Sequence, residues 1–366
     1  MKILMLTAAM DIGGAETHIL ELSRELVRRG HFVTVASNGG VYVEELESCG
    51  VKHLSAPLHT KNPRDMSRAK KILCRHIAEE GYDVVHAHAR IPGFVGAKAA
   101  KKCGVPFVTT FHGVYNPVWY LRMLTRVGKY TLAVSEDVRE YLKKYYGTPH
   151  DAIELTVNGI DTAKFESDAD APAVIPEMAD GECIVCVTRL DCASAWHVFR
   201  MIEAMPQILE NRPEAKLIIV GGGDVLDEVR AEAAKVNAVA GDRITVAGPR
   251  TDIAQILKRA KIFVGVSRAA MEAMACRVPV ILSGAQGHLG IFTPDLEETA
   301  VLTNFCCRDR DVADKDELAR NTVQLLSYSD DELRELGDFD RDVVMRLYSV
   351  GRMADDAEAL YSRILG

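Results

Sequence analysis

The sequence predicts an α/β protein of two domains, each built on a doubly wound parallel sheet. Three observations lead to this prediction. The chain has 366 residues, about twice the usual length of a single domain. Short apolar runs typical of buried strands alternate with longer segments whose apolar residues recur at helical spacing. This alternation occurs twice along the chain, and parallel sheets with crossover helices produce such a pattern.

The first series of alternating segments fills the N-terminal part of the chain. Helical spacing is found, for example, over 15–29 and 135–146. The strands expected here are Lys2–Thr7, Phe32–Ser37, Asp83–His86, Pro106–Thr110, Tyr130–Val134 and Ile153–Val157. Residues 1–161 therefore form the predicted N-terminal domain.

A break follows the turn sequence Asn158-Gly159-Ile160-Asp161. Residues 162–181 are rich in Ala, Asp and Pro and contain no core element, which predicts a linker. The alternation resumes over 182–345, the predicted C-terminal domain, and the helical pattern within 346–366 predicts a helix that packs back on the N-terminal domain. The strands expected in the C-terminal domain are Cys183–Val187, Lys216–Val220, Arg243–Ala247, Lys261–Val266 and Pro279–Leu282.

Charge is distributed unevenly along the chain. Residues 1–160 carry 21 Lys and Arg against 16 Asp and Glu, whereas residues 161–366 carry 23 against 36. A solvated helix face and attraction to an anionic membrane surface both explain the basic first half. Nucleic-acid binding is not expected, because aromatic residues do not alternate with the charges. The basic residues cluster at Lys61, Arg64, Arg68, Lys70, Lys71 and Arg75, and again at Arg122, Arg126 and Lys129.

The nine cysteines and the apolar runs indicate a cytoplasmic protein. Cys183 and Cys186 lie on one predicted strand with their sulfurs on opposite faces, so neither a zinc site nor a redox pair is expected. Reduced thiols suit the cytosol. No apolar run approaches the ~18 residues that span a bilayer, and residues 1–10 are interpreted as a strand rather than a signal peptide.

The stretch Ile262–Leu282 is the most informative, because a strand, a short helix and a second strand follow one another directly. Ser267 is the predicted N-cap, which places the helix N-terminus at the carboxyl end of a strand, where open α/β sheets receive anions. Arg268 adds a cation there, and Glu272, one turn later, can accept hydrogen bonds from ribose hydroxyls. A buried helix with two solvated charges at its edge is the structural alternative.

Three other loops are expected at strand ends. Gly13 and Gly14 follow the first strand and let the backbone approach a phosphate or sugar closely. His112 follows the strand Pro106–Thr110, and Arg189 follows Cys183–Val187, where it can hold a diphosphate or pair with a surface carboxylate. No glycine motif has the G-x-G-x-x-G spacing, which argues against a nicotinamide enzyme.

In their order along the chain, these motifs resemble those of glycosyltransferases of the GT-B architecture, specifically the large retaining family 4. The resemblance covers residues 1 to about 285. It implies two Rossmann-like domains with a cleft between them, a nucleotide sugar bound mainly by the second domain, and an acceptor received mainly by the first. The matching segments are Lys2–Thr7 with Gly13–His18, Asp83–His88, Thr110–Gly113, Val134–Ser135, Val157–Asp161, Thr188–Leu190 and Glu272–Ile281.

The resemblance also implies roles for single residues. Gly13 and Gly14 would approach the donor phosphate and sugar, and His112, as catalytic residue, would contact the sugar near the reacting carbon. Arg189 would neutralise the diphosphate, and Glu272 would bind the ribose hydroxyls. Neither a metal nor a cofactor is expected, because helix N-termini and arginine side chains stabilise the leaving diphosphate. Retention would proceed on the front face of the sugar.

Two positions depart from the family pattern. The family usually has a lysine where this chain has Ser194, and a glutamate where it has Val264, in a donor-site loop that is absent here. Arg268, on the shortened turn, is our candidate for the missing positive charge, and His197 is a second candidate.

The sequence therefore predicts a glycosyltransferase that uses a nucleoside-diphosphate sugar, UDP-sugar by default, in cell-surface glycan or glycolipid synthesis. The acceptor is unknown; a lipid-linked one, with peripheral contact to the inner face of the membrane, fits the basic first domain. Two alternatives remain. One is a non-catalytic sugar-nucleotide-binding protein, consistent with the missing lysine and glutamate. The other is a GT-B-like sugar-nucleotide epimerase.

Overall fold

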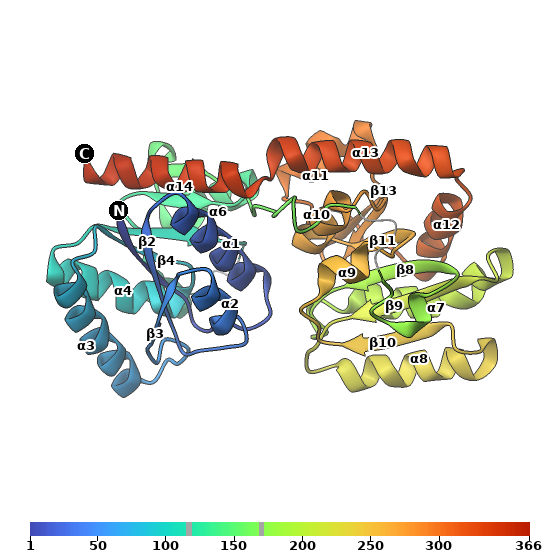
Figure 1. Ribbon diagram of the computed structural model, residues 1–366, viewed down its shortest axis with the longest axis horizontal. Coiled ribbons are helices and arrows are strands. Elements are labelled where there is room, and N and C mark those ends of the chain that lie inside the picture. The colour runs from blue at the N-terminus through green and yellow to red at the C-terminus, as the bar shows by residue number, and fades with distance from the viewer. Residues whose placement is uncertain (115–118, 168–171) are drawn as a thin grey trace. The chain divides into compact units, whose positions relative to one another are not determined.

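The computed structural model describes residues 1–114, 119–167 and 172–366, which form two compact units (Figure 1). Unit 1 comprises Met1–Gly159 and Tyr348–Gly366, and unit 2 comprises Ile160–Leu347. Each unit contains one sheet with helices on both faces, seven-stranded in unit 1 and six-stranded in unit 2. The predicted fold class, with two doubly wound sheets, is confirmed.

The sheet of unit 1 has the order β3-β2-β1-β4-β5-β6-β7, and all its pairings are parallel. The chain runs outward from β1 to β3 and then returns to β4 on the other side of β1. The carboxyl ends of β1 and β4 therefore form the switch point at which open sheets bind ligands. The strands are β1 (Lys2–Leu6), β2 (Phe32–Ser37), β3 (Lys52–Ser55), β4 (Val84–Ala87), β5 (Phe107–Phe111), β6 (Thr131–Ala133) and β7 (Ile153–Leu155).

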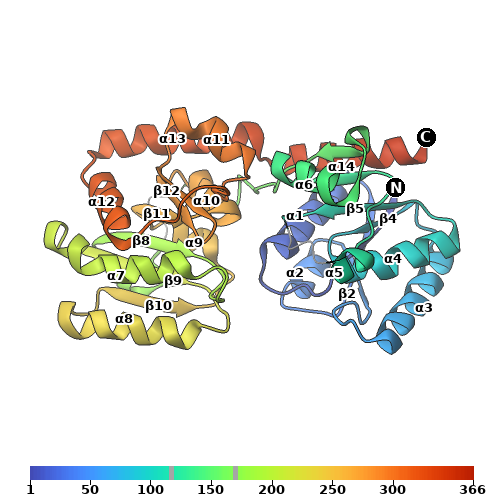
Figure 2. The ribbon, with the colours of Figure 1, turned by 180° about the vertical axis from the view of Figure 1, so that it is seen from behind.

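Helices α3 (Pro63–Glu80) and α4 (Arg90–Cys103) cover one face of this sheet, and α1 (Gly14–Arg28) and α14 (Val350–Leu365) cover the other (Figures 1 and 2). Val85 of β4 belongs to the apolar core beneath α3 and α4. Because side chains alternate along a strand, His86 points to the opposite face. The remaining helices are α2 (Val43–Ser48), α5 (Trp119–Leu124) and α6 (Glu136–Tyr146).

Helix α14 is fastened to unit 1 by buried and charged contacts. Tyr361 is fully buried, and its hydroxyl lies 2.6 Å from Nδ1 of His86. Arg29, just after α1, pairs with Asp355 at 2.6 Å, and Nε2 of His31 lies 2.6 Å from a carboxylate oxygen of Glu358. The end of the chain is thus part of the N-terminal unit.

The sheet of unit 2 has the order β10-β9-β8-β11-β12-β13, with β13 antiparallel to β12 and the other pairings parallel. The order reverses between β8 and β11, which makes their carboxyl ends the switch point of this unit. The strands are β8 (Glu182–Val187), β9 (Ala215–Val220), β10 (Ile244–Gly248), β11 (Ile262–Gly265), β12 (Val280–Gly284) and β13 (Gly287–Ile291).

The main apolar core of unit 2 lies between its sheet and the helices α7 (Trp196–Asn211), α8 (Leu226–Ala240) and α12 (Lys315–Leu326). Cys186 belongs to this core, and all nine cysteines are free thiols, as expected. The other helices of the unit are α9 (Ile253–Leu257), α10 (Ser267–Ala275), α11 (Glu297–Leu302) and α13 (Asp330–Leu347), and α10 packs against α13.

The segment predicted as a linker, 162–181, is counted with unit 2, and its residues 168–171 lie outside the described ranges. Arg341 of α13 explains the attachment of its first residues. The buried guanidinium donates to the carbonyl oxygen of Ala275 and pairs with Glu166. Within the described ranges, no helix combines the length and apolar character needed to cross a membrane.

Candidate functional site

The turn between β11 and α10 is shaped by a tertiary contact. Val266 is the N-cap of α10, and Ser267 is its first residue, so the prediction that Ser267 caps the helix was wrong. Ser267 has a φ of 59°, and its backbone N–H donates to the carbonyl oxygen of Phe305 at 2.8 Å. Positive φ is unfavourable for a residue with a Cβ, so the contact with Phe305 fixes this conformation.

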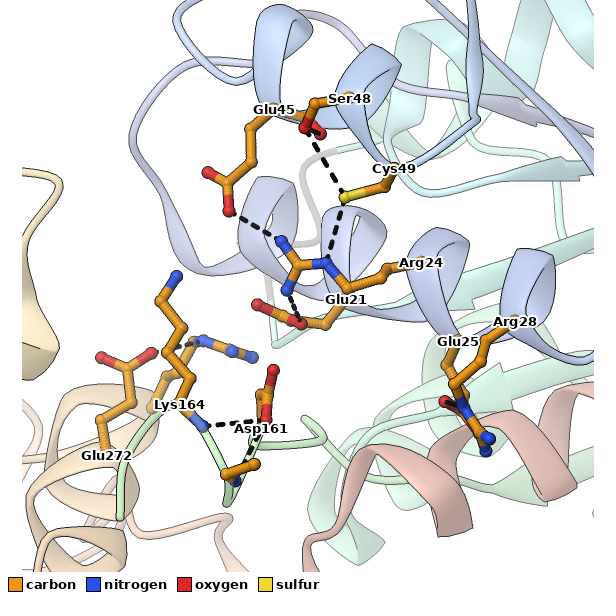
Figure 3. Close-up of polar contacts among 12 residues, drawn as sticks. Glu21, Arg24, Glu25, Arg28, Glu45, Ser48, Cys49, Asp161, Lys164 and Glu272 are labelled. Carbon is orange, nitrogen blue, oxygen red and sulfur yellow. Dashed lines mark hydrogen bonds and ion pairs between the residues drawn. The ribbon is translucent and has the colours of Figure 1, made fainter. Parts of the chain in front are cut away.

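Arg268 and Glu272 form a buried ion pair on α10. The guanidinium Nε lies 2.8 Å from Oε1 of Glu272, and each residue is only 8% exposed. Positions four apart lie on the same face of a helix, so the two charges meet one turn into α10. Figure 3 shows Glu272 projecting from this helix. The sequence prediction placed both side chains at the same site, and the structure joins them directly.

The predicted residues after β8 lie in different environments. The Arg189 side chain is 63% exposed and lies 3.9 Å from Oδ2 of Asp191. Strands β8 and β11 pair in parallel, so Arg189, which follows β8, lies at the same edge of the sheet as the start of α10, which follows β11. Ser194 lies in a turn in which its N–H donates to Oδ1 of Asp191 at 2.8 Å. His197 does not supply a cation, since it is only 2% exposed and burial lowers its pKa to about 4.

The loop after β1 leads directly into α1. Gly13 is the N-cap in an extended conformation, and Gly14 is the first helical residue. A Cβ added at Gly14 would meet no atom within 4 Å, so the helix N-terminus opens onto free space. The backbone here is accessible, as the close approach of a phosphate or sugar requires.

His112 follows β5 and lies among other histidines. Its Nε2 is 3.2 Å from Nδ1 of His88, and its ring centroid is 4.6 Å from that of His18 on α1. Burial lowers the pKa of His86 to about 3, and burial together with the neighbouring imidazoles lowers the pKa of His88 well below its usual value. The imidazoles of His86 and His88 are therefore uncharged at neutral pH.

Sequence reasoning named only His112 of this cluster as a site residue. The pattern His86-Ala87-His88 at the end of a buried strand was the available signal, because alternation places both rings on one face. Within the described ranges, His18, His88 and His112 are the one group whose possible metal-ligand atoms converge, all within 4.8 Å of one another. Three imidazoles are a donor set suited to zinc by residue type.

A second polar cluster in unit 1 links α1 to α2. Arg24 of α1 donates to Glu21 and Glu45, both at 2.7 Å, and its Nε lies 3.3 Å from Sγ of Cys49 (Figure 3). Glu21 and Glu45 thus share one guanidinium, and the Arg24–Glu45 pair connects α1 with α2.

Comparison with known proteins gives a consistent result. Residues 12–164 match the family described as Glycosyltransferase Family 4, and residues 181–328 match Glycosyl transferases group 1. The chain is 28% identical over 329 residues to an uncharacterized glycosyltransferase of Methanocaldococcus jannaschii, covering 80% of this chain and 82% of that protein. It is 27% identical over 242 residues to a phosphatidyl-myo-inositol mannosyltransferase of Mycolicibacterium smegmatis, covering 60% and 58%.

A solved structure shows the same fold. The Anabaena protein Alr3699/HepE in complex with UDP-glucose superposes with a TM-score of 0.76 at 17% identity, over 99% of each chain. At this identity the likeness concerns the fold alone.

Proposed function

Because the chain belongs to the GT-B glycosyltransferases of family 4, we propose that it transfers a sugar from a nucleoside-diphosphate sugar, with retention at the anomeric carbon and without a metal ion. The proposed donor is a UDP-sugar. The likeness to a protein solved with UDP-glucose supports this choice. The acceptor we propose is lipid-linked, and the similarity to a phosphatidyl-myo-inositol mannosyltransferase supports it.

The observation that carries this proposal is the buried Arg268–Glu272 pair at the start of α10. The Glu272 carboxylate would accept hydrogen bonds from the ribose hydroxyls. Negative charge grows on the diphosphate as it leaves, and a fixed guanidinium beside a helix N-terminus stabilises that charge. Arg189, exposed after β8, would supply a second cation. Arg268 and Arg189 together would supply the positive charge of the family's lysine, which is Ser194 in this chain.

His112 is the proposed catalytic residue, in contact with the donor sugar near the reacting carbon. Gly13 and Gly14 would let the backbone approach the donor phosphate and sugar. In a front-face reaction the acceptor attacks from the side on which the diphosphate departs, and the configuration is retained. The anomeric configuration of the glycosidic bond in the product, determined by NMR, tests this directly, and an inverted product would contradict it. Activity that persists in excess chelator is expected.

Binding measurements with variants test the donor site. Thermal shift with UDP, GDP and ADP, and with their sugars, should identify the base, because a ligand that binds only the folded state raises its stability. In Arg268→Ala the donor affinity should fall by about 1.5–3 kcal/mol through loss of a charged hydrogen bond. Arg230→Ala, on the exposed face of α8, is the matched control. Unchanged donor affinity in Arg268→Ala would refute the assigned role.

The reaction itself separates the competing functions. Nucleoside diphosphate released together with a glycosylated acceptor supports the transferase. Donor binding without turnover on any acceptor would indicate a non-catalytic protein, and conversion of the donor sugar without acceptor would indicate an epimerase.

The membrane contact proposed for a lipid-linked acceptor involves helix α3, and the protein would act at the inner face of the cytoplasmic membrane. The apolar side of α3 is buried through Ala69, Leu73 and Ile77. Lys61, Arg64, Arg68, Lys71 and Arg75 are exposed. Each basic residue near an anionic surface contributes about 1 kcal/mol, so reversing Arg68, Lys71 and Arg75 to Glu should lower binding to phosphatidylserine vesicles by about fivefold or more per residue. Lys235→Glu on α8 is the control, and unchanged binding would exclude this surface.

A further inference from the structure

Four imidazoles of unit 1 form a continuous column, here called the histidine column: His86, His88, His112 and His18. Neighbouring ring centroids are 4.1 Å apart for His86 and His88, 5.4 Å for His88 and His112, and 4.6 Å for His112 and His18. The residues come from β4, from the ends of β4 and β5, and from α1. The column therefore lies at the switch point of the unit 1 sheet and includes the proposed catalytic residue.

Both ends of the column are held by hydrogen bonds. His86 lies 2.6 Å from the Tyr361 hydroxyl through Nδ1 and 2.7 Å from the Thr110 hydroxyl through Nε2. Nδ1 of His18 lies 3.2 Å from the side-chain oxygen of Asn158. An amide oxygen only accepts, so His18 carries its proton on Nδ1. The rings that flank His88 and His112 thus have fixed orientations.

The contact between His88 and His112 is a single hydrogen bond between ring nitrogens. Nδ1 of His88 lies 3.2 Å from Nε2 of His112, and two bare nitrogens would repel each other at this distance, so one of the two carries a proton. His88 is buried, and its Nε2 has no hydrogen-bond partner among the residues that the structure describes, so this bond is the one that holds its ring. Either ring can be the donor, and in both cases the bond fixes the same relative orientation.

We propose that His88 is the positioning residue of His112: the hydrogen bond between Nδ1 of His88 and Nε2 of His112 holds the His112 ring in one orientation. The role in transfer rests on the proposed function, whereas the hydrogen bond does not. Because Nε2 of His112 is occupied, this nitrogen does not remove a proton from the acceptor. His112 then acts as a fixed polar contact to the sugar, and its preorganisation lowers the barrier.

The same geometry separates this role from metal binding. A zinc ion held by His18, His88 and His112 needs a bare lone pair on each ligating nitrogen. The hydrogen bond proposed here places a proton between His88 and His112. Both cannot hold at once, so stoichiometric metal in the purified, untagged protein would overturn the proposal.

Kinetics of two His88 variants test the positioning role. His88→Leu removes the hydrogen-bond partner of His112, and kcat should fall by about 10- to 100-fold with little change in the KM for the sugar donor. His88→Asn keeps an amide that can donate or accept close to the position of Nδ1 and should recover most of that loss. His59→Leu, at an exposed histidine outside the column, should match the wild type. Equal losses in the folded Leu and Asn variants, or no loss in either, would overturn the proposal.

A spectroscopic measurement keeps the inference testable without activity. In protein labelled with 15N-histidine, long-range proton–nitrogen correlations report which ring nitrogen carries the proton. We expect a proton on one of the two facing nitrogens, Nδ1 of His88 or Nε2 of His112, and none on the other, assigned by comparison with the variants, and a change at His112 in His88→Leu. A wild-type protein in which both of these nitrogens carry a proton, or neither does, would overturn the proposal. Absence of sugar transfer by the wild type, with the expected protonation pattern, would instead contradict the proposed function alone.

Discussion

Acidification should destabilise unit 1 through His86. Burial lowers the pKa of this imidazole from the ordinary 6.5 of an unfolded chain to about 3 in the folded protein. The folded state therefore favours the neutral ring. Its stabilising contribution is complete above pH 6.5 and is lost as the pH falls from 6.5 toward 3. The loss arises because the unfolded chain binds a proton that the folded chain does not.

The magnitude at pH 5 follows from the distance to the unfolded pKa. That pH is about 1.5 units below 6.5, and each unit contributes about 1.4 kcal/mol, so the free energy of unfolding should fall by about 2 kcal/mol relative to pH 7.5. This loss of free energy at pH 5 changes little for any pKa of His86 below about 4 in the folded protein. His88, whose pKa is also lowered by burial, adds a loss of the same sign.

Urea unfolding, monitored by hydrogen exchange with mass spectrometry, measures this loss of unfolding free energy in each unit separately. Peptides from β1 and β4 report on unit 1, and peptides from β8 and β9 report on unit 2. The distinction is needed because His197 of unit 2, with a pKa of about 4, should cause a similar loss there.

Two variants isolate the contribution of His86. In His86→Gln the difference in unfolding free energy between pH 7.5 and 5.0 should shrink by about 2 kcal/mol in unit 1. Tyr361→Phe removes the hydroxyl beside His86 and should cost about 1–3 kcal/mol at both pH values without changing the difference. If wild type and His86→Gln lose the same free energy on acidification, the buried imidazole is not the cause and the reasoning fails.

Three further predictions concern packing in the two units. In Gly337→Ala the new Cβ would lie 2.3 Å from the carbonyl oxygen of Arg277, so the melting temperature should drop, with a loss of about 1–3 kcal/mol. Gly351→Ala in α14, where no such atom is nearer than 3.8 Å, should instead stabilise by about 0.5–1 kcal/mol, and a fall in melting temperature would contradict this. Arg341→Leu should speed limited proteolysis within 162–181, because Glu166 is left with its pairing to Arg277 and the Ala275 carbonyl loses the guanidinium. The exposed Arg334→Leu on the same helix should not have this effect.

The fold was predictable because its central strands are apolar runs that can be recognised in the local sequence alone. Two edge strands were missed because they are not apolar runs. The four residues of β3, Lys52–Ser55, include a single aliphatic side chain, and β13 contains two glycines and a histidine among five residues. Such strands are formed by pairing with an existing sheet, as β13 pairs antiparallel with β12. Their local sequence carries little strand signal.

Those residues of the candidate site that directly follow a strand could be placed at the edge of a sheet from the sequence. Glu272 and Arg268 were placed together by helical spacing alone. The N-cap at Ser267 was wrong because the conformation of that residue is set by the carbonyl of Phe305, which lies 38 residues away along the chain. His197 was offered as a cation because its burial cannot be seen in the sequence. The partners of His112 were missed because they lie on separate elements, α1 and β4.

The two units solve opposite electrostatic problems in the proposed transfer. The leaving diphosphate gains negative charge, and unit 2 offers two cations, the buried Arg268 and the exposed Arg189, at its switch point. The sugar, with its oxocarbenium-like transition state, gains positive charge, and a protonated imidazole beside it would raise the barrier. In unit 1 the proposed polar contact, His112, is bonded to His88, and burial lowers the pKa of both His88 and its neighbour His86. The burial that makes unit 1 sensitive to acid would therefore also keep the positive charge of these two imidazoles away from the sugar.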